Sequence, residues 1–179
     1  KKQALVHLEF LTETHREQIE GGRFFLHEHP GAAGPRQEKC ISDLLETPGV
    51  SRVCGDQCQY GREVQYGELR GQPVRKATGF MSNAPTVLQR RARRFAGRGG
   101  TCSRAKGGKH VQASGRVAMD VARYSNGLCR AMIRGMMGEM QTQGIWRPGE
   151  VGLHAVSGED EAKAAAPTGC SGKWRDDIS

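Results

Sequence analysis

The sequence predicts an α/β protein built on part of a doubly wound sheet, with flanking helices, glycine-rich loops and an extended C-terminal tail. Three observations predict this class. Helical and strand-like segments alternate along the first 140 residues. Hydrophobic residues make up only 36% of the 179 residues and aromatic residues 6%, which indicates a small core. The 25 glycines indicate long loops. We therefore expect an α/β domain over 1–140 and an extended tail or linker over 141–179.

The first two elements have clear boundaries. Residues 2–20 carry apolar side chains at spacings of three and four, which predicts an amphipathic helix. The pair Gly21–Gly22 then provides a helix stop. The aromatic segment 23–28 follows as a buried strand, and Pro30 marks its end.

The middle of the chain alternates between short elements and turns. A short helix is expected at 37–46 and a second strand at 50–54. A glycine-rich, hairpin-like excursion then runs to Gln72. The segment 73–83 reads as a third strand that ends in a turn.

The remaining elements are mainly helical. Pro85 favours the start of a helix over 86–94, which becomes strongly basic. Residues 97–110 form a loop of glycine, arginine and lysine. Apolar spacing predicts helical structure over 116–140, with a break at Asn126–Gly127.

The charge of the chain points to anionic partners. The formal net charge is +8, which favours nucleic acid or an acidic protein surface. Eight cations fall within 20 residues that contain no Asp or Glu. The expected phosphate-binding residues are Arg90, Arg91, Arg93, Arg94, Arg98, Arg104, Lys106 and Lys109. The alternative is a solvated helix end that leads into a mobile loop.

The six cysteines are too sparse for a disulfide scaffold, so we expect reduced thiols in an intracellular protein of the nucleus or an organelle. Cys54, Cys58, Cys102 and His110 are candidate zinc ligands, although the Cys-x3-Cys spacing is loose. The alternative is that these cysteines are small core or loop residues. We assign no metal, because the Cys-x3-Cys spacing is loose and the other partners lie far apart in sequence. We assign no cofactor, because no strand–Gly-x-Gly–helix cradle occurs.

Glu28 follows an apolar strand and stands between two histidines, which makes it a candidate acid/base group. The alternative is a loop carboxylate flanked by solvated histidines. A hydrolase has no support, because the chain lacks a Gly-x-Ser-x-Gly elbow and no histidine lies near Cys58 in sequence. No run of 18 apolar residues occurs, so we expect no transmembrane segment.

Several blocks resemble, in the same order, a region of retroelement-type polyproteins of algal protists. The first is the run from Gly22 to Pro30. The others are 56–61, 73–83, 107–110 and 124–131, so that the resemblance spans about residues 4 to 135. The region is similar, more distantly, to the C-terminal half of phage-type cytosine-5 DNA methyltransferases.

The methyltransferase resemblance implies that Glu28 stands at the position of the glutamate that contacts the cytosine ring. This chain departs from the family in lacking the Pro-Cys nucleophile loop and the glycine-rich methyl-donor site. His29 replaces the usual Asn, Ala77 replaces a proline, and Phe95 stands where the polyprotein block has a cysteine. The domain is thus expected to be a truncated, methyltransferase-like domain in which Glu28 is vestigial.

Three functions follow from these observations. The first is a non-catalytic module that binds nucleic acid or another polyanion through its basic loop. The second is a structural accessory subunit of a large multi-subunit assembly, organellar or photosynthetic. The third is one half of a split cytosine methyltransferase that another polypeptide completes. Catalysis by the chain alone is not expected.

Overall fold

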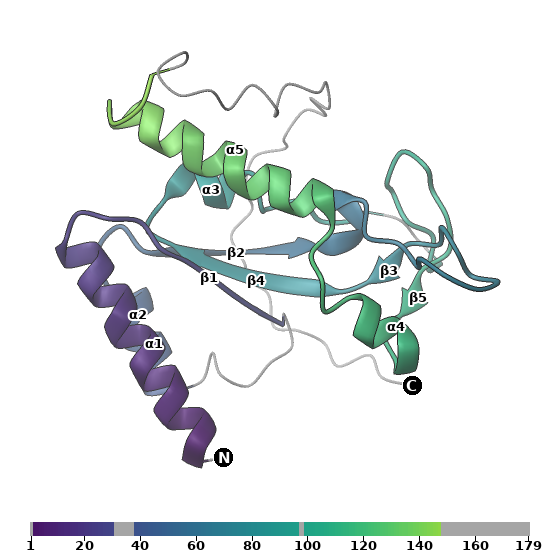
Figure 1. Ribbon diagram of the computed structural model, residues 1–179, viewed down its shortest axis with the longest axis horizontal. Helices are drawn as coiled ribbons and strands as arrows, with labels where there is room; N and C mark the ends of the chain where they lie inside the picture. Colours follow the sequence, from purple (N-terminus) through teal and green to yellow (C-terminus); the bar gives the residue numbers. More distant parts are fainter. Residues whose placement is uncertain (1, 31–37, 97–98, 148–179) are drawn as a thin grey trace.

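A small β-sheet with helices on both faces forms the centre of the molecule in the computed structural model (Figure 1). The structure describes residues 2–30, 38–96 and 99–147. Helices α1 (Lys2–Glu20) and α2 (Lys39–Leu45) cover one face. Helices α3 (Pro85–Gln89) and α5 (Asn126–Thr142) cover the other face. The α/β class and the flanking helices are therefore confirmed.

The sheet itself is antiparallel. It contains β1 (Leu26–Pro30), β2 (Ser51–Asp56) and β4 (Ala77–Ser82), in the spatial order β1-β4-β2. Strand β4 pairs antiparallel with both neighbours. A doubly wound sheet has parallel neighbours, so the described strands do not form the expected half of one. The β1–α2–β2 segment does connect two strands of the same direction, but β4 is inserted between them. The arrangement is a split β-α-β unit.

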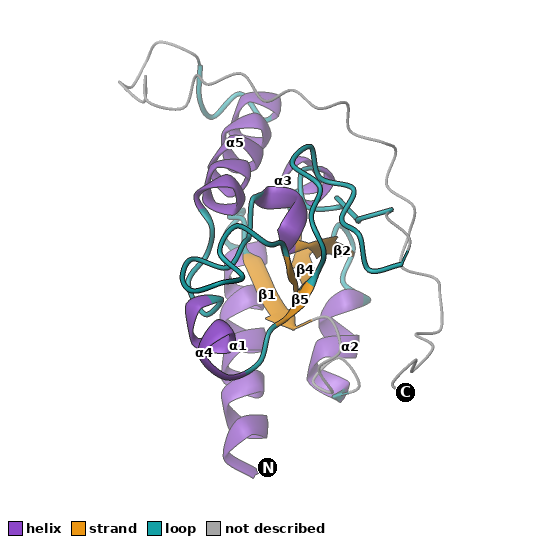
Figure 2. Ribbon diagram, turned by 90° about the vertical axis from the view of Figure 1, so that its right-hand side faces the viewer, coloured by secondary structure: helices purple, strands orange, loops and turns teal. Residues whose placement is uncertain are grey.

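Consecutive side chains of β4 pack against the helices on opposite faces of the sheet, because neighbours in a strand point to opposite faces. Met81 packs with Phe25, Ile41 and Leu44 beneath α1 and α2. Phe80, fully buried, points to the opposite face. The two apolar clusters together hold the sheet between its helices. Figure 2 shows α3 and α5 above the strands and α2 below them.

The second face of the sheet is closed by a tight contact between α3 and α5. Phe80, Leu88 and Leu128 form the apolar centre of this layer. Gly135 permits the close approach, because a Cβ atom there would lie 2.7 Å from the Cα of Val87. Helices α3 and α5 therefore lie in close contact at this point.

A smaller unit lies beyond the end of β2 and the start of β4. It contains the 3₁₀ helix η2 (Gln57–Tyr60) and helix α4 (Gly115–Asp120). It also contains the short parallel strands β3 (Val74–Arg75) and β5 (Val111–Gln112). Its apolar centre is formed by Val64, Val74, Val121 and their neighbours. This unit carries the site described below.

Most expected elements are present, with boundaries that tertiary contacts have moved. Helix α1 matches the prediction for 2–20, whereas β1 begins at Leu26 rather than at residue 23. Helix α3 ends at Gln89 instead of 94. The chain turns away there because the Asp56 backbone N–H donates to the Arg93 carbonyl at 2.8 Å.

The predicted break at Asn126–Gly127 is wrong in position. Helices α4 and α5 are separated by 121–125, and Asn126 is the first residue of α5. The Ser125 side chain accepts a hydrogen bond from the Leu128 N–H, as an N-cap does. Helix α5 continues to Thr142, past the proposed boundary at 140, and 148–179 of the expected tail lie outside the described residues. Within the described residues no helix is long and apolar enough to cross a membrane.

Candidate metal centre and basic surface

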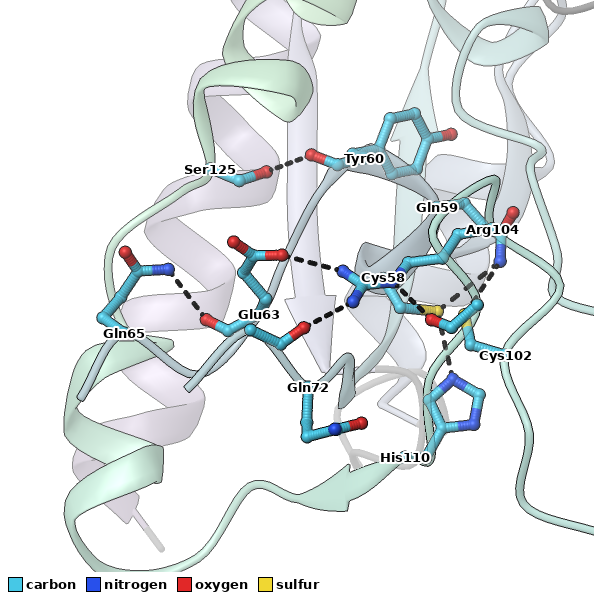
Figure 3. A network of polar contacts seen from close by, with 12 residues as sticks. Cys58, Gln59, Tyr60, Glu63, Gln65, Gln72, Cys102, Arg104, His110 and Ser125 are labelled. Carbon is cyan, nitrogen blue, oxygen red and sulfur yellow. Dashed lines mark hydrogen bonds and ion pairs between the residues drawn. The ribbon is translucent and has the colours of Figure 1, made fainter. Parts of the chain in front are cut away.

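Two thiols and an imidazole from distant parts of the sequence meet in the smaller unit. They belong to Cys58, Cys102 and His110, and one ligand atom from each lies within 4.8 Å of the other two. Figure 3 shows the three side chains converging, with Gln59 above them. Soft sulfur atoms with one imidazole nitrogen form a common ligand set for Zn²⁺.

Helix η2 holds the first of these side chains at the end of β2. The backbone N–H of Gln57 donates to the Lys76 carbonyl at 3.0 Å. The amide side chain of Gln57 donates to the Thr78 hydroxyl, also at 3.0 Å. These bonds tie η2 to the strand region 74–82, and the next side chain, that of Cys58, is fully buried. Cys58 is therefore in a fixed position.

The other two side chains lie on opposite arms of one hairpin, which spans 100–110. The backbone N–H of Cys102 donates to the Gly108 carbonyl, and that of His110 donates to the Gly100 carbonyl, both at 2.8 Å. An antiparallel bridge joins Thr101 to Lys109 between them. The hairpin thus brings together two ligand-type residues that are eight positions apart in sequence.

Arg104 fixes the tip of this hairpin. Its guanidinium forms an ion pair with Glu63 at 3.0 Å and donates to the carbonyls of Gly71 and Gly107. The Arg104 side chain is only 9% exposed. Because three acceptors from two segments surround it, this arginine holds the hairpin against 63–71 (Figure 3).

The side-chain amide of Gln59 faces both sulfur atoms. Its Nε2 lies 3.7 Å from Sγ of Cys58 and 3.5 Å from Sγ of Cys102. It also donates to the hydroxyl of Ser103. An N–H group directed at sulfur stabilises a thiolate more than a thiol, because the thiolate carries the charge. The position of Gln59 is that of an outer-shell partner of a metal ligand.

The imidazole of His110 is close to sulfur on one side and to an aromatic ring on the other. Its Nε2 is 3.4 Å from Sγ of Cys58. The Phe95 ring packs against it at a centroid distance of 4.5 Å. The Nδ1 atom is buried and meets no hydrogen-bond partner among the described residues. Desolvation lowers the pKa of His110, which favours the neutral imidazole.

The cluster does not fit a cysteine nucleophile. The histidine that the sequence does not place near Cys58 is adjacent in space, as a Cys–His pair requires. However, Cys58 is fully buried, so a substrate cannot reach its sulfur. Desolvation, followed by the neighbouring Cys102, raises the pKa of the Cys58 thiol to about 12.

The fourth candidate ligand, Cys54, is not part of the described metal-ligand group. It lies on β2, buried and paired in register with Gly79 of the sheet. The loose Cys54-x3-Cys58 spacing therefore does not form a ligand pair, because the chain turns from strand into η2 between the two thiols.

Four of the eight expected phosphate-binding cations are engaged within the protein. Arg91 is fully buried, and its guanidinium donates to the Leu128 carbonyl beneath α5, so no phosphate reaches it in this structure. Arg94 forms an ion pair with Asp56 at 3.1 Å. Arg93 lies over the Tyr60 ring, and Arg104 is the hairpin residue described above.

Three of the remaining cations, Arg90, Lys106 and Lys109, are exposed. Arg98 lies outside the described residues. Lys106 and Lys109 lie on the 100–110 hairpin, next to the thiol–imidazole cluster, whereas Arg90 directly follows α3. We call these three residues the exposed basic set.

Glu28 occupies the second face of the sheet, away from this cluster. One carboxylate oxygen accepts a hydrogen bond from the Tyr124 hydroxyl at 2.9 Å. Burial, followed by the neighbouring carboxylate, raises the pKa of Tyr124 to about 12. The flanking His27 and His29 are both buried rather than solvated. Nδ1 of His27 lies 3.1 Å from Nε2 of His15, which belongs to α1.

Comparisons with protein-family models, with curated proteins and with solved structures find no match for this chain. Sequence reasoning did not identify Gln59 as a partner of the sulfurs or Arg104 as a hairpin residue. Their contacts are with residues up to 43 positions away, which no local pattern reveals.

Proposed function

We propose that this protein is a non-catalytic module that binds nucleic acid or another polyanion through the exposed basic set. The observation that carries the proposal is an imbalance of charge. From Leu69 to Met119 the sequence contains twelve Lys and Arg residues and no Asp or Glu. Such a segment attracts phosphates and releases their counterions on binding.

The two carboxylates that form ion pairs with arginines of this segment strengthen the proposal. Asp56 and Glu63 are already paired, with Arg94 and Arg104 respectively. They therefore do not neutralise Arg90, Lys106 and Lys109, which remain available to an outside anion. These residues present charge without aromatic rings for base stacking, so binding is expected to follow the backbone rather than the sequence of the nucleic acid.

The test is affinity for double-stranded DNA and for RNA over a series of salt concentrations. The triple substitution of Arg90, Lys106 and Lys109 to Ala leaves up to three phosphates without a cation. It should then reduce the slope of log K against log salt by about 0.9 for each of these phosphates on B-DNA. The matched control changes Lys2, Arg16 and Lys39 to Ala, which removes the same charge from α1 and α2. Equal weakening in both variants, or no salt dependence, would contradict the proposal.

A second candidate function, that of an accessory subunit, is favoured by one observation. Helix α1 exposes Val6 to 59% and Phe10 to 62%. Exposed apolar side chains on one helix are suited to contact with another protein chain. If the accessory role holds, Phe10→Ser should abolish association with a partner while leaving the isolated chain folded. Co-purification from native extract with both forms of the chain is the measurement.

A further inference from the structure

We propose that Cys58, Cys102 and His110 bind one Zn²⁺ ion, which joins the 100–110 hairpin to helix η2. This site is independent of polyanion binding, since it concerns the folding of the hairpin rather than what its surface contacts. The site is built from one residue of η2 and one from each arm of the hairpin.

The distances between ligand atoms suit one ion. Bonds of about 2.3 Å to sulfur and about 2.0 Å to nitrogen, in tetrahedral geometry, separate sulfur from nitrogen by about 3.6 Å. The measured distance from Nε2 of His110 to Sγ of Cys58 is 3.4 Å. All three ligand atoms lie within 4.8 Å of one another. Only small rotations of the side chains are therefore needed to coordinate an ion.

The chemistry of the ligands selects the metal. Two thiolates and an imidazole favour Zn²⁺ over the hard cations Mg²⁺ and Ca²⁺, which prefer oxygen. Within the described residues, no further His, Cys, Asp or Glu joins this group of three. A fourth position is thus left to a ligand that the described residues do not supply. A pocket of about 390 Å³, lined by Leu69, Lys109, His110 and their neighbours, lies beside the imidazole.

The surroundings of the three ligands also fit a metal. Gln59 directs its amide at both sulfurs, as an outer-shell donor does. Phe95 packs edge-on against the His110 ring and helps to fix its orientation. The principal rival is a disulfide between Cys58 and Cys102, for which a histidine at 3.4 Å and a shared amide donor have no function.

The first test measures metal content in the full chain purified without chelator. Mass spectrometry of the elements should find about one zinc per chain. The variants Cys58→Ser, Cys102→Ser and His110→Ala should each lose it. Cys40→Ser and Cys129→Ser are the matched controls, since these cysteines lie outside the cluster, and both should retain zinc.

The second test uses the unaltered chain, so that a ligand variant that fails to fold leaves the proposal testable. Co²⁺ added to the chelator-treated protein should give the visible absorption of tetrahedral cobalt and a near-ultraviolet band of thiolate ligation. Zn²⁺ should then displace both signals. The proposal would be overturned if these bands were absent or if the control variants lost zinc. It would also be overturned if the mass of the chain were two hydrogens lower and the difference mapped to a Cys58–Cys102 disulfide.

Discussion

The sheet layer beneath α5 and the 100–110 hairpin are held together by different kinds of contact. Apolar side chains from four elements fill the layer, with Tyr60, Phe80 and Leu128 at its centre. The hairpin instead depends on Arg104, on Gln59 and on the thiol–imidazole cluster. Apolar packing needs no metal and is not screened by salt, whereas metal contacts and ion pairs depend on metal and on ionic strength respectively. The two regions should therefore fail under different conditions.

The largest expected effect on stability comes from a substitution in the apolar layer. Phe80→Ala removes a fully buried ring from β4 and should lower the free energy of unfolding by about 3–5 kcal/mol. Urea denaturation followed by circular dichroism measures this decrease. Leu69→Ala, at a side chain that is 51% exposed, is the control and should change stability little. A small effect of Phe80→Ala would show that the layer does not carry the fold.

The opposite face of the sheet should be sensitive to acid. Desolvation, followed by repulsion from His15 and His29, lowers the pKa of His27 to about 4, from 6.5 in the unfolded chain. The unfolded state therefore binds the proton first as pH falls through 6.5, and stability decreases until pH reaches about 4. The decrease should be on the order of 2 kcal/mol after allowance for solvent screening. His27→Phe should show a flatter profile of unfolding free energy against pH between 7 and 4.

In the hairpin, the Arg104–Glu63 ion pair should contribute a measurable coupling energy. The Arg104 side chain is 9% exposed and that of Glu63 is 27% exposed, so the pair is less screened than a surface pair. A double-mutant cycle with Arg104→Met and Glu63→Gln should give about 1–2 kcal/mol. The same cycle on Lys39 and Asp43, an exposed pair on α2, should give less than about 0.5 kcal/mol. Equal coupling in the two cycles would mean that Arg104 does not organise the hairpin.

An effect of similar size, on metal affinity rather than on stability, is expected at the outer shell of the proposed zinc site. Gln59→Leu removes the amide that donates to both sulfurs and should weaken zinc binding by about tenfold. Competition with a chromophoric chelator measures this affinity. Gln65→Leu is the control, because its amide donates to the Glu63 carbonyl and not to sulfur. The stability of the apolar layer should be the same in both variants.

Hydrogen exchange measures both regions in one experiment. Removal of metal by a chelator should expose the amides of Cys102 and His110, whose hydrogen bonds close the hairpin. The amides of β4, which are bonded on both sides, should stay protected. If both regions became unprotected together, the two would form one cooperative unit.

The amino-acid sequence alone determined the elements with local signals. The apolar spacing of 2–20 fixed α1, because this pattern depends only on neighbours within a few residues. The single strand expected over 73–83 is instead two, β3 and β4, which belong to different sheets. Only the tertiary structure decided the antiparallel order β1-β4-β2, since pairing between strands depends on contacts far apart in sequence. The tertiary structure also places two neighbouring arginines in opposite environments. Arg91 is buried under α5, whereas Arg90 is exposed. The sequence contained every ligand of the candidate site, but the meeting of Cys58 with His110 across 52 positions required the chain to fold.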